Sequence, residues 1–386
     1  MTGDLVTPGA AYSTDPNPTG RPNQRRMVVW GIIATGFLIA WLVLAYLLGA
    51  DNGIQVTLMA AVFAALPLLV VVPTFLWMDR LEAEPWRYLA FAYLWGALCA
   101  AAGSMFLNTG VHFLLLLSRA PDADSLAAVL SAPPVEEGLK GLGVLLILLF
   151  RRREFDGVID GVVYAGLAGA GFAFTENLFY LSRAYEAGGS EAFAYVFFLR
   201  CITGPFAHPL FTACIGIGLG LAASVARTRG AKIGFGLAGF VAAMLLHGIW
   251  NLSASLGGYW KTYFAFQVPI FIGFVVLVVM LRSREGTLIR RYLSQYADAG
   301  WLTPNEVAML ATMATRRAAR TWAKSTGGQP ALRSMRAFQD SASDLALLRS
   351  RMVRGAAEPE APARERELLE AITAHRAAFV PRYAAA

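Results

Sequence analysis

The sequence predicts an all-α polytopic membrane protein with about eight transmembrane helices, both ends in the cytoplasm and a helical cytoplasmic tail. The first observation is composition: 56% of the 386 residues are hydrophobic, and mean hydropathy is +0.51. Charged residues make up 15%, whereas a soluble domain has about 25%. The second is that several apolar stretches can cross a hydrocarbon core about 30 Å thick. The third is that basic residues gather in alternate connections.

The chain divides into three parts: a polar segment 1–26 that we expect to be disordered, a membrane-embedded domain 27–283 and a charged, Ala/Arg-rich tail 284–386. In the third span we expect a break at Asn108-Thr109-Gly110, and Pro205 and Pro209 predict an irregular start to the sixth. In the tail, Thr303-Pro304-Asn305-Glu306 is a capping box that predicts a helix start. We place the spans near 27–49, 54–78, 87–117, 132–150, 157–182, 203–226, 231–255 and 262–282.

The distribution of Lys and Arg predicts the orientation of these spans. One set of alternate connections holds thirteen basic residues and the other set holds four, which favours the N-in, C-in topology. The net charge of +7 therefore reports orientation, and we expect no nucleic-acid partner. The thirteen are Arg21, Arg25, Arg26, Arg80, Arg87, Arg151, Arg152, Arg153, Arg227, Arg229, Lys232, Arg282 and Arg284, and the four are Arg119, Arg183, Arg200 and Lys261.

Two adjacent carboxylates stand at the start of the fourth span. Glu136 and Glu137 follow Pro133-Pro134, and proline is tolerated where the first helical N–H groups have no partner. Lys140 is four residues after Glu136 and therefore lies on the same helix face. Ionisable groups at membrane depth are costly and mark function by default.

Three other spans bring polar residues to a similar depth. In the predicted topology, Glu176 of span five, His208 of span six and His247 of span seven all lie toward the outer surface. Asn251 is four residues after His247 on the same face. Because chance would scatter such groups through the membrane, this shared level predicts one site built from four helices.

A set of two histidines and several carboxylates indicates hydrolysis, most naturally of a peptide bond. Two histidines and a glutamate are typical ligands of a catalytic Zn²⁺, with a second glutamate as general base. Without metal, a glutamate can activate water while His and Asn stabilise the oxyanion. Both mechanisms stay open here, as do two non-enzymatic alternatives: a transporter, and a scaffold that uses the cluster as a polar network. We expect His112 to be an interhelical hydrogen-bonding residue, His375 a surface residue, and Cys99, Cys201 and Cys214 to fill core space.

The motifs resemble those of the PrsW family of bacterial intramembrane proteases and, more distantly, the CAAX-protease/bacteriocin-immunity superfamily. They are Glu-Glu-x-x-Lys at 136–140, Phe-x-x-x-Glu-Asn at 172–177, His-Pro at 208–209 and His-x-x-x-Asn at 247–251, within residues 60–280. The resemblance implies a multi-pass endopeptidase of the bacterial cell membrane. It also implies a single-span membrane protein as substrate, such as an anti-sigma factor cut at its first site on the outer side.

Residues and resemblance together predict the roles of the site residues. Glu136 or Glu137 would be the base, and we favour Glu136 because Lys140 is its i+4 partner. Asn251 would be a supporting or oxyanion residue. Glu176, His208 and His247 would bind the metal or polarise the carbonyl. The predicted partners are the lipid bilayer and the membrane-anchored substrate.

Overall fold

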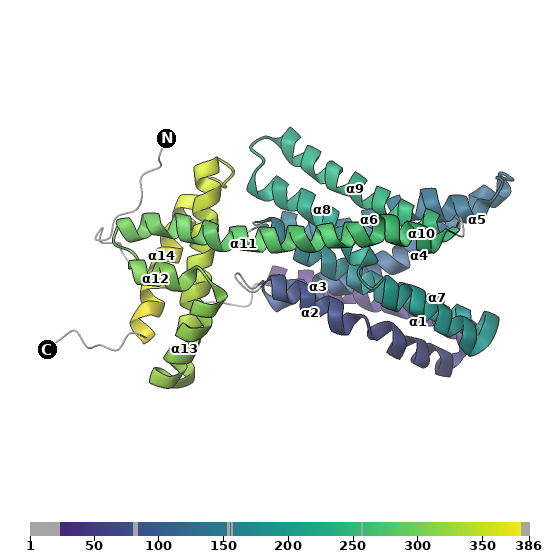
Figure 1. Ribbon diagram of the computed structural model, residues 1–386, viewed down its shortest axis with the longest axis horizontal. Helices are drawn as coiled ribbons and strands as arrows, with labels where there is room; N and C mark the ends of the chain where they lie inside the picture. Colours follow the sequence, from purple (N-terminus) through teal and green to yellow (C-terminus); the bar gives the residue numbers. More distant parts are fainter. Residues whose placement is uncertain (1–23, 80–83, 153–154, 156, 256–257, 380–386) are drawn as a thin grey trace.

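The computed structural model describes residues 24–79, 84–152, 155, 157–255 and 258–379, and within them the chain forms helices and no strand (Figure 1). Most of the polar segment 1–26, together with Arg80, Arg153 and Asp156, lies outside the described residues. The helices are α1 (Gln24–Ala65), α2 (Leu68–Met78), α3 (Trp86–Leu94), α4 (Ala101–Leu117), α5 (Ala123–Leu126), α6 (Ala132–Phe150), α7 (Val158–Phe197), α8 (Ala207–Ser224), α9 (Arg229–Ser255), α10 (Tyr259–Thr262), α11 (Val268–Asp298), α12 (Pro304–Leu310), α13 (Met313–Arg354) and α14 (Ala361–Phe379). Single π-helical turns occupy Trp95–Ala100, Ala127–Ser131, Phe198–Thr203 and Tyr263–Gln267.

Six helical stretches in the described residues are long and apolar enough to cross a membrane, so the protein is a multi-pass membrane protein. One of them, Val158–Ser224, contains two of the spans expected from the sequence. Helix α6 is not among the six, and its 19 residues include Glu136, Glu137 and Lys140. The count of eight and the N-in, C-in orientation therefore stay predictions.

The irregularity in the third span is not where the sequence suggested. The expected break at Asn108-Thr109-Gly110 is wrong, because α4 runs through these residues. The regular α-helical hydrogen bonding of this span is interrupted instead at the π-helical turn Trp95–Ala100, between α3 and α4. The irregular start of the sixth span is confirmed: a π-helical turn ends at Thr203, and α8 begins at Ala207 with Pro209 in its first turn.

Helix α7 lies at the centre of the bundle and packs closely against α8. A Cβ added to Gly161 would lie 2.0 Å from the carbonyl oxygen of Gly216, so the two backbones touch where only glycine fits. Nearer the site, a Cβ on Gly169 would lie 2.7 Å from the carbonyl oxygen of His208. These close approaches set α7 directly against the first turn of α8, which carries His208.

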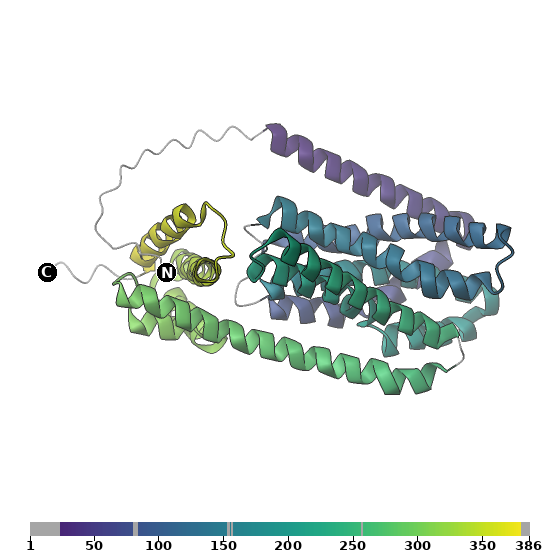
Figure 2. The ribbon, with the colours of Figure 1, turned by 90° about the horizontal axis from the view of Figure 1, so that it is seen from above.

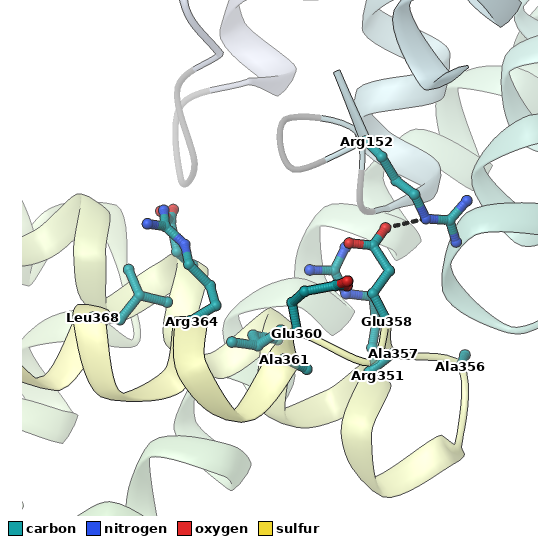
Figure 3. A pocket seen from close by; sticks show the side chains of 11 residues that line it. Arg152, Arg351, Ala356, Ala357, Glu358, Glu360, Ala361, Arg364 and Leu368 are labelled. Carbon is teal, nitrogen blue, oxygen red and sulfur yellow. Dashed lines mark ion pairs between the residues drawn. The ribbon is translucent and has the colours of Figure 1, made fainter. Parts of the chain in front are cut away.

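The tail has its own hydrophobic core, formed by α12–α14 and the end of α11. Figure 2 shows α11 running along one edge of the bundle and on into this tail. The boundary that we placed between residues 283 and 284 therefore falls inside this helix. The capping box at Thr303 and Glu306 is confirmed. Arg152, just after α6, forms an ion pair with Glu358 in the segment before α14, beside a pocket of about 40 Å³ (Figure 3).

Candidate active site

Glu137 is a buried carboxylate with donors on both oxygens. Its Oε1 accepts a hydrogen bond from Nζ of Lys140 at 2.6 Å and lies 2.9 Å from Nδ1 of His247. Its Oε2 accepts from the hydroxyl of Thr212 on α8 at 2.9 Å. Because a buried charge is tolerated only when it is paired and hydrogen-bonded, these contacts explain how Glu137 stays in the bundle at 0% exposure.

Glu136 is buried too, but it is held on one side only. Its Oε1 accepts a hydrogen bond from the amide of Asn108 on α4 at 3.2 Å. Its Oε2 lies 3.7 Å from both Nζ of Lys140 and Nε2 of His247 and has no hydrogen-bond partner. Buried polar atoms are nearly always satisfied, so this oxygen is an acceptor that the protein itself leaves unused.

The two histidines use their ring nitrogens differently. His247 places Nδ1 2.9 Å from Oε1 of Glu137 and Nε2 3.7 Å from Oε2 of Glu136. His208 places Nδ1 3.1 Å from Nζ of Lys140 and Nε2 2.7 Å from Oε2 of Glu176. The two rings meet edge to face with their centroids 5.1 Å apart. Both imidazoles therefore face the same group of carboxylates.

Glu176 is positioned by an arginine from the π-helical turn before α8. Arg200 donates from Nη2 to Oε2 of Glu176 at 2.5 Å and from Nε to the side-chain oxygen of Asn177 at 2.8 Å. The guanidinium also lies 4.0 Å from the ring centroid of Tyr180. This planar fork fixes the carboxylate that contacts His208.

Lys140 links the glutamate pair to His208. Its ammonium group is fully buried and lies 3.9 Å from the centroid of the Phe172 ring on α7, in a cation–π arrangement. Asn251 lies apart from the cluster, since its amide donates to the carbonyl oxygen of Ala128 at 2.8 Å. That bond ties α9 to the π-helical turn that leads into α6.

The structure therefore brings together six of the seven residues singled out in the sequence: Glu136, Glu137, Lys140, Glu176, His208 and His247. Sequence reasoning missed three that complete the site: Asn108, Arg200 and Thr212. Arg200 had been placed in a connection, and Asn108 had been interpreted as a helix breaker. In the sequence, each of these three could have been noticed only as a polar residue in or beside an apolar stretch. Such a position does not indicate which residue it contacts.

The donor set fits a divalent metal. Glu136, His208 and His247 each offer a ligand atom, and these atoms all lie within 4.8 Å of one another. Ligands about 2.1 Å from a tetrahedral ion are separated by roughly 3.4 Å, so a small contraction would close the set around Zn²⁺. From the sequence we had predicted Glu176 as the acidic metal ligand, whereas the three atoms that lie close together here include one from Glu136. Three glutamates lie beside one lysine and one arginine, so the cluster is rich in carboxylate oxygens, the atoms that a divalent cation accepts as ligands.

The minor sequence predictions concern residues outside this site. His112 pairs with Asp124 at 2.8 Å between Nε2 and Oδ1, which confirms a hydrogen-bonding role on an exposed face. Cys99, Cys201 and Cys214 are free thiols, as expected for side chains that fill space.

Apolar helices around a buried cluster of glutamates, histidines and a lysine define a multi-pass membrane protein with a candidate metal site inside its bundle. The family model described as "PrsW family intramembrane metalloprotease" matches residues 84–280, about half of the chain and all of the cluster. The chain belongs to this family and is a membrane peptidase.

Two curated relatives carry the name Protease PrsW. The protein from Geobacillus kaustophilus is 28% identical over 173 residues, which cover 45% of this chain and 69% of that relative. The protein from Oceanobacillus iheyensis is 31% identical over 147 residues, which cover 38% of this chain and 62% of that relative. No solved structure matches the chain.

Proposed function

We propose that this protein is an intramembrane endopeptidase that hydrolyses peptide bonds of membrane-anchored proteins with water activated by Glu136. The observation that supports this best is the free Oε2 of Glu136, buried and 3.7 Å from Nε2 of His247. A general base must have a free acceptor within reach of the water that it deprotonates. Glu137 lacks one, because both of its oxygens are engaged.

In this mechanism each residue of the cluster has a separate task. Glu136 takes a proton from water as the water oxygen bonds to the scissile carbonyl carbon, and it later gives that proton to the departing amine. Glu137 orients His247 through Nδ1 and is itself held by Thr212. The ammonium of Lys140 stabilises the negative charge around both glutamates.

The residues that would hold Zn²⁺ are His208 and His247, with Glu176 as the acidic ligand. When bound, the ion would supply a Lewis acid that polarises the scissile carbonyl. Arg200 holds the carboxylate of Glu176 beside His208, and Nε2 of His208 would have to exchange its 2.7 Å contact with Glu176 for the ion.

The family resemblance suggests an anti-sigma factor or a similar single-span protein as the substrate, cut at its first site. The membrane helices support a membrane-anchored chain as substrate, because such a chain lies in the same bilayer as the helices that carry the cluster. We propose that the bilayer and this single-span protein are the partners.

The test uses the purified full chain in proteoliposomes with a model single-span substrate. We expect Glu136→Gln to lower the cleavage rate by about 10²- to 10⁴-fold, the usual contribution of a general base. Glu191→Gln, an exposed substitution on α7, is the matched control and should leave the rate unchanged. Normal cleavage by Glu136→Gln would remove Glu136 from the role of base, and a transporter or scaffold would predict no cleavage even by the unaltered chain.

Metal analysis of the same preparations tests the ligand assignment. We expect Glu136→Gln to retain the bound metal and His247→Ala to lose it. If Glu136→Gln also loses the metal, Glu136 is a ligand and not the base. Full activity of a metal-free preparation would instead support the metal-free glutamate mechanism.

A further inference from the structure

An apolar cavity of about 240 Å³ lies next to the candidate active site. It is formed where the entry to α8, the end of α9 and the start of α11 meet. Two of its lining residues, Ile202 and Phe271, are themselves exposed, so the cavity opens on the outer surface of the bundle. Most of its wall is apolar or aromatic and comes from Phe206, Leu210, Phe211, Trp250, Tyr263 and Phe271.

The size and lining of the cavity fit a large apolar side chain. An apolar cavity of about 150 Å³ is enough to hold benzene, so this one can take a Leu, Met or Phe side chain. Two of the polar side chains are engaged: the hydroxyl of Tyr263 donates to the carbonyl oxygen of Thr203, and the Thr203 hydroxyl lies 2.5 Å from that of Tyr259. The amide of Gln267 also lines the cavity and carries no charge. A charged occupant would find little to pair with on this wall.

One ring separates the cavity from the catalytic histidines. Phe211 lines the cavity, and its ring stacks on His247 with the centroids 5.2 Å apart and the planes inclined by 23°. The same ring lies 5.9 Å from that of His208. With van der Waals contact on each face, a group in the cavity would sit about 7–8 Å from the imidazole. An extended chain advances about 3.3 Å per residue, so the occupant belongs to a residue within a few positions of a bond held at the histidines.

Small residues at the entry to α8 keep this space open. A Cβ on Gly204 would lie 2.9 Å from Cη2 of Trp250, so glycine is what allows the indole to form the wall. Ala207, the first residue of α8, also lines the cavity with a side chain of one carbon. A larger residue at position 207 would occupy the volume directly.

We propose that this cavity is a specificity subsite that binds a bulky apolar side chain of the membrane-anchored substrate, within a few residues of the scissile bond. The inference rests on the proposed endopeptidase function and adds to it the side chain that the enzyme selects. The occupant is a substrate side chain because the cavity joins the outer surface of the bundle to the ring that stacks on His247.

The first experiment measures occupancy without catalysis. The Glu136→Gln chain in nanodiscs is illuminated with synthetic single-span peptides of about 25 residues, each carrying one photoreactive phenylalanine at a scanned position, and adducts are mapped by mass spectrometry. We expect one position to label Phe211, Trp250 or Tyr263. Ala207→Phe should lower that labelling at least tenfold, whereas the exposed substitution Ala238→Phe on α9 should not.

Three outcomes of this experiment would overturn the proposal. In the first, no peptide position labels the lining residues. In the second, the lining residues are labelled equally with and without Ala207→Phe. In the third, they are labelled by a phosphatidylcholine with a photoreactive acyl chain that the peptide does not displace, which would make the cavity a lipid site.

The second experiment measures selectivity in the unaltered chain. Two substrates differ only at the labelled position, one with Phe and one with Ala, and we expect the Phe form to be cleaved about tenfold faster or more. Ala207→Phe should reduce that ratio toward one, and an unchanged ratio would overturn the proposal. If peptides label the cavity but neither substrate is cleaved, the proposed function fails while the cavity still binds apolar side chains.

Discussion

Removal of the buried ammonium at Lys140 should be among the most damaging single changes in the membrane bundle. The side chain is fully buried, donates to Oε1 of Glu137 at 2.6 Å and lies 3.1 Å from Nδ1 of His208. Lys140→Met keeps a similar volume but leaves Glu137 as a buried carboxylate without its cation. Breaking a buried ion pair on one side costs about 3–5 kcal/mol, so we expect a loss of that size in the free energy of unfolding.

A double substitution separates the ion pair from simple packing. In Lys140→Met with Glu137→Gln no unpaired charge remains at that pair, and we expect much of the lost stability to return. Unfolding in detergent micelles, followed by tryptophan fluorescence, measures all three variants. Lys261→Met, on the exposed side of α10, is the matched control. A loss below about 1 kcal/mol for Lys140→Met, or strictly additive effects in the double variant, would refute the reasoning, since coupled neighbours deviate from additivity by about 0.5–3 kcal/mol.

Two further predictions concern single polar groups. Thr212→Val removes the donor to Oε2 of Glu137 at 2.9 Å and should cost about 1–3 kcal/mol of unfolding free energy, measured in the same assay; a value near zero would mean that another donor replaces the hydroxyl. Burial raises the pKa of Asp79, the residue after α2, from 3.8 to about 8. The folded state therefore binds the extra proton, so stability should fall as the pH rises from about 4 to about 8. Thermal unfolding over this range should show a shallower slope for Asp79→Asn, and an unaltered slope would exclude Asp79 as its cause.

Much of the helical fold could be predicted because a segment that crosses lipid must be apolar, must be long enough to span the hydrocarbon core and must hydrogen-bond its own backbone. Apolar stretches of sufficient length identify helices, and the prolines near the start of α8 mark its irregular entry. The error at Asn108 has a physical reason. An Asn-Thr-Gly sequence weakens a helix in water, but inside a bundle the amide of Asn108 has a partner in Glu136, and α4 continues.

The site was predictable to the extent that its residues are unusual in a membrane. Glutamate, histidine and lysine at depth are rare enough to be noticed singly, and their shared level then suggests one cluster. Thr212 and Arg200 gave no such signal. Threonine is ordinary in membrane helices, and Arg200 lies at the end of an apolar run where arginine reports orientation. Their partners, Glu137 and Glu176, are 75 and 24 residues away in the chain, so only the packed structure reveals the contacts.

The difference between the two adjacent glutamates shows what the helix itself contributes. Consecutive residues of an α-helix point about 100° apart, because 3.6 residues complete a turn. Glu137 therefore faces α8 and α9, where Thr212 and His247 contact it at hydrogen-bond distance. Glu136 faces α4 and accepts its one hydrogen bond from Asn108, while its other oxygen lies 3.7 Å from Lys140 and from His247. From the sequence, the i+4 spacing to Lys140 was the one feature that set Glu136 apart, yet Nζ of Lys140 lies 2.6 Å from Glu137 and 3.7 Å from Glu136. The packing of α6 divides them into one carboxylate that contacts a histidine at hydrogen-bond distance and one whose second oxygen has no hydrogen-bond partner.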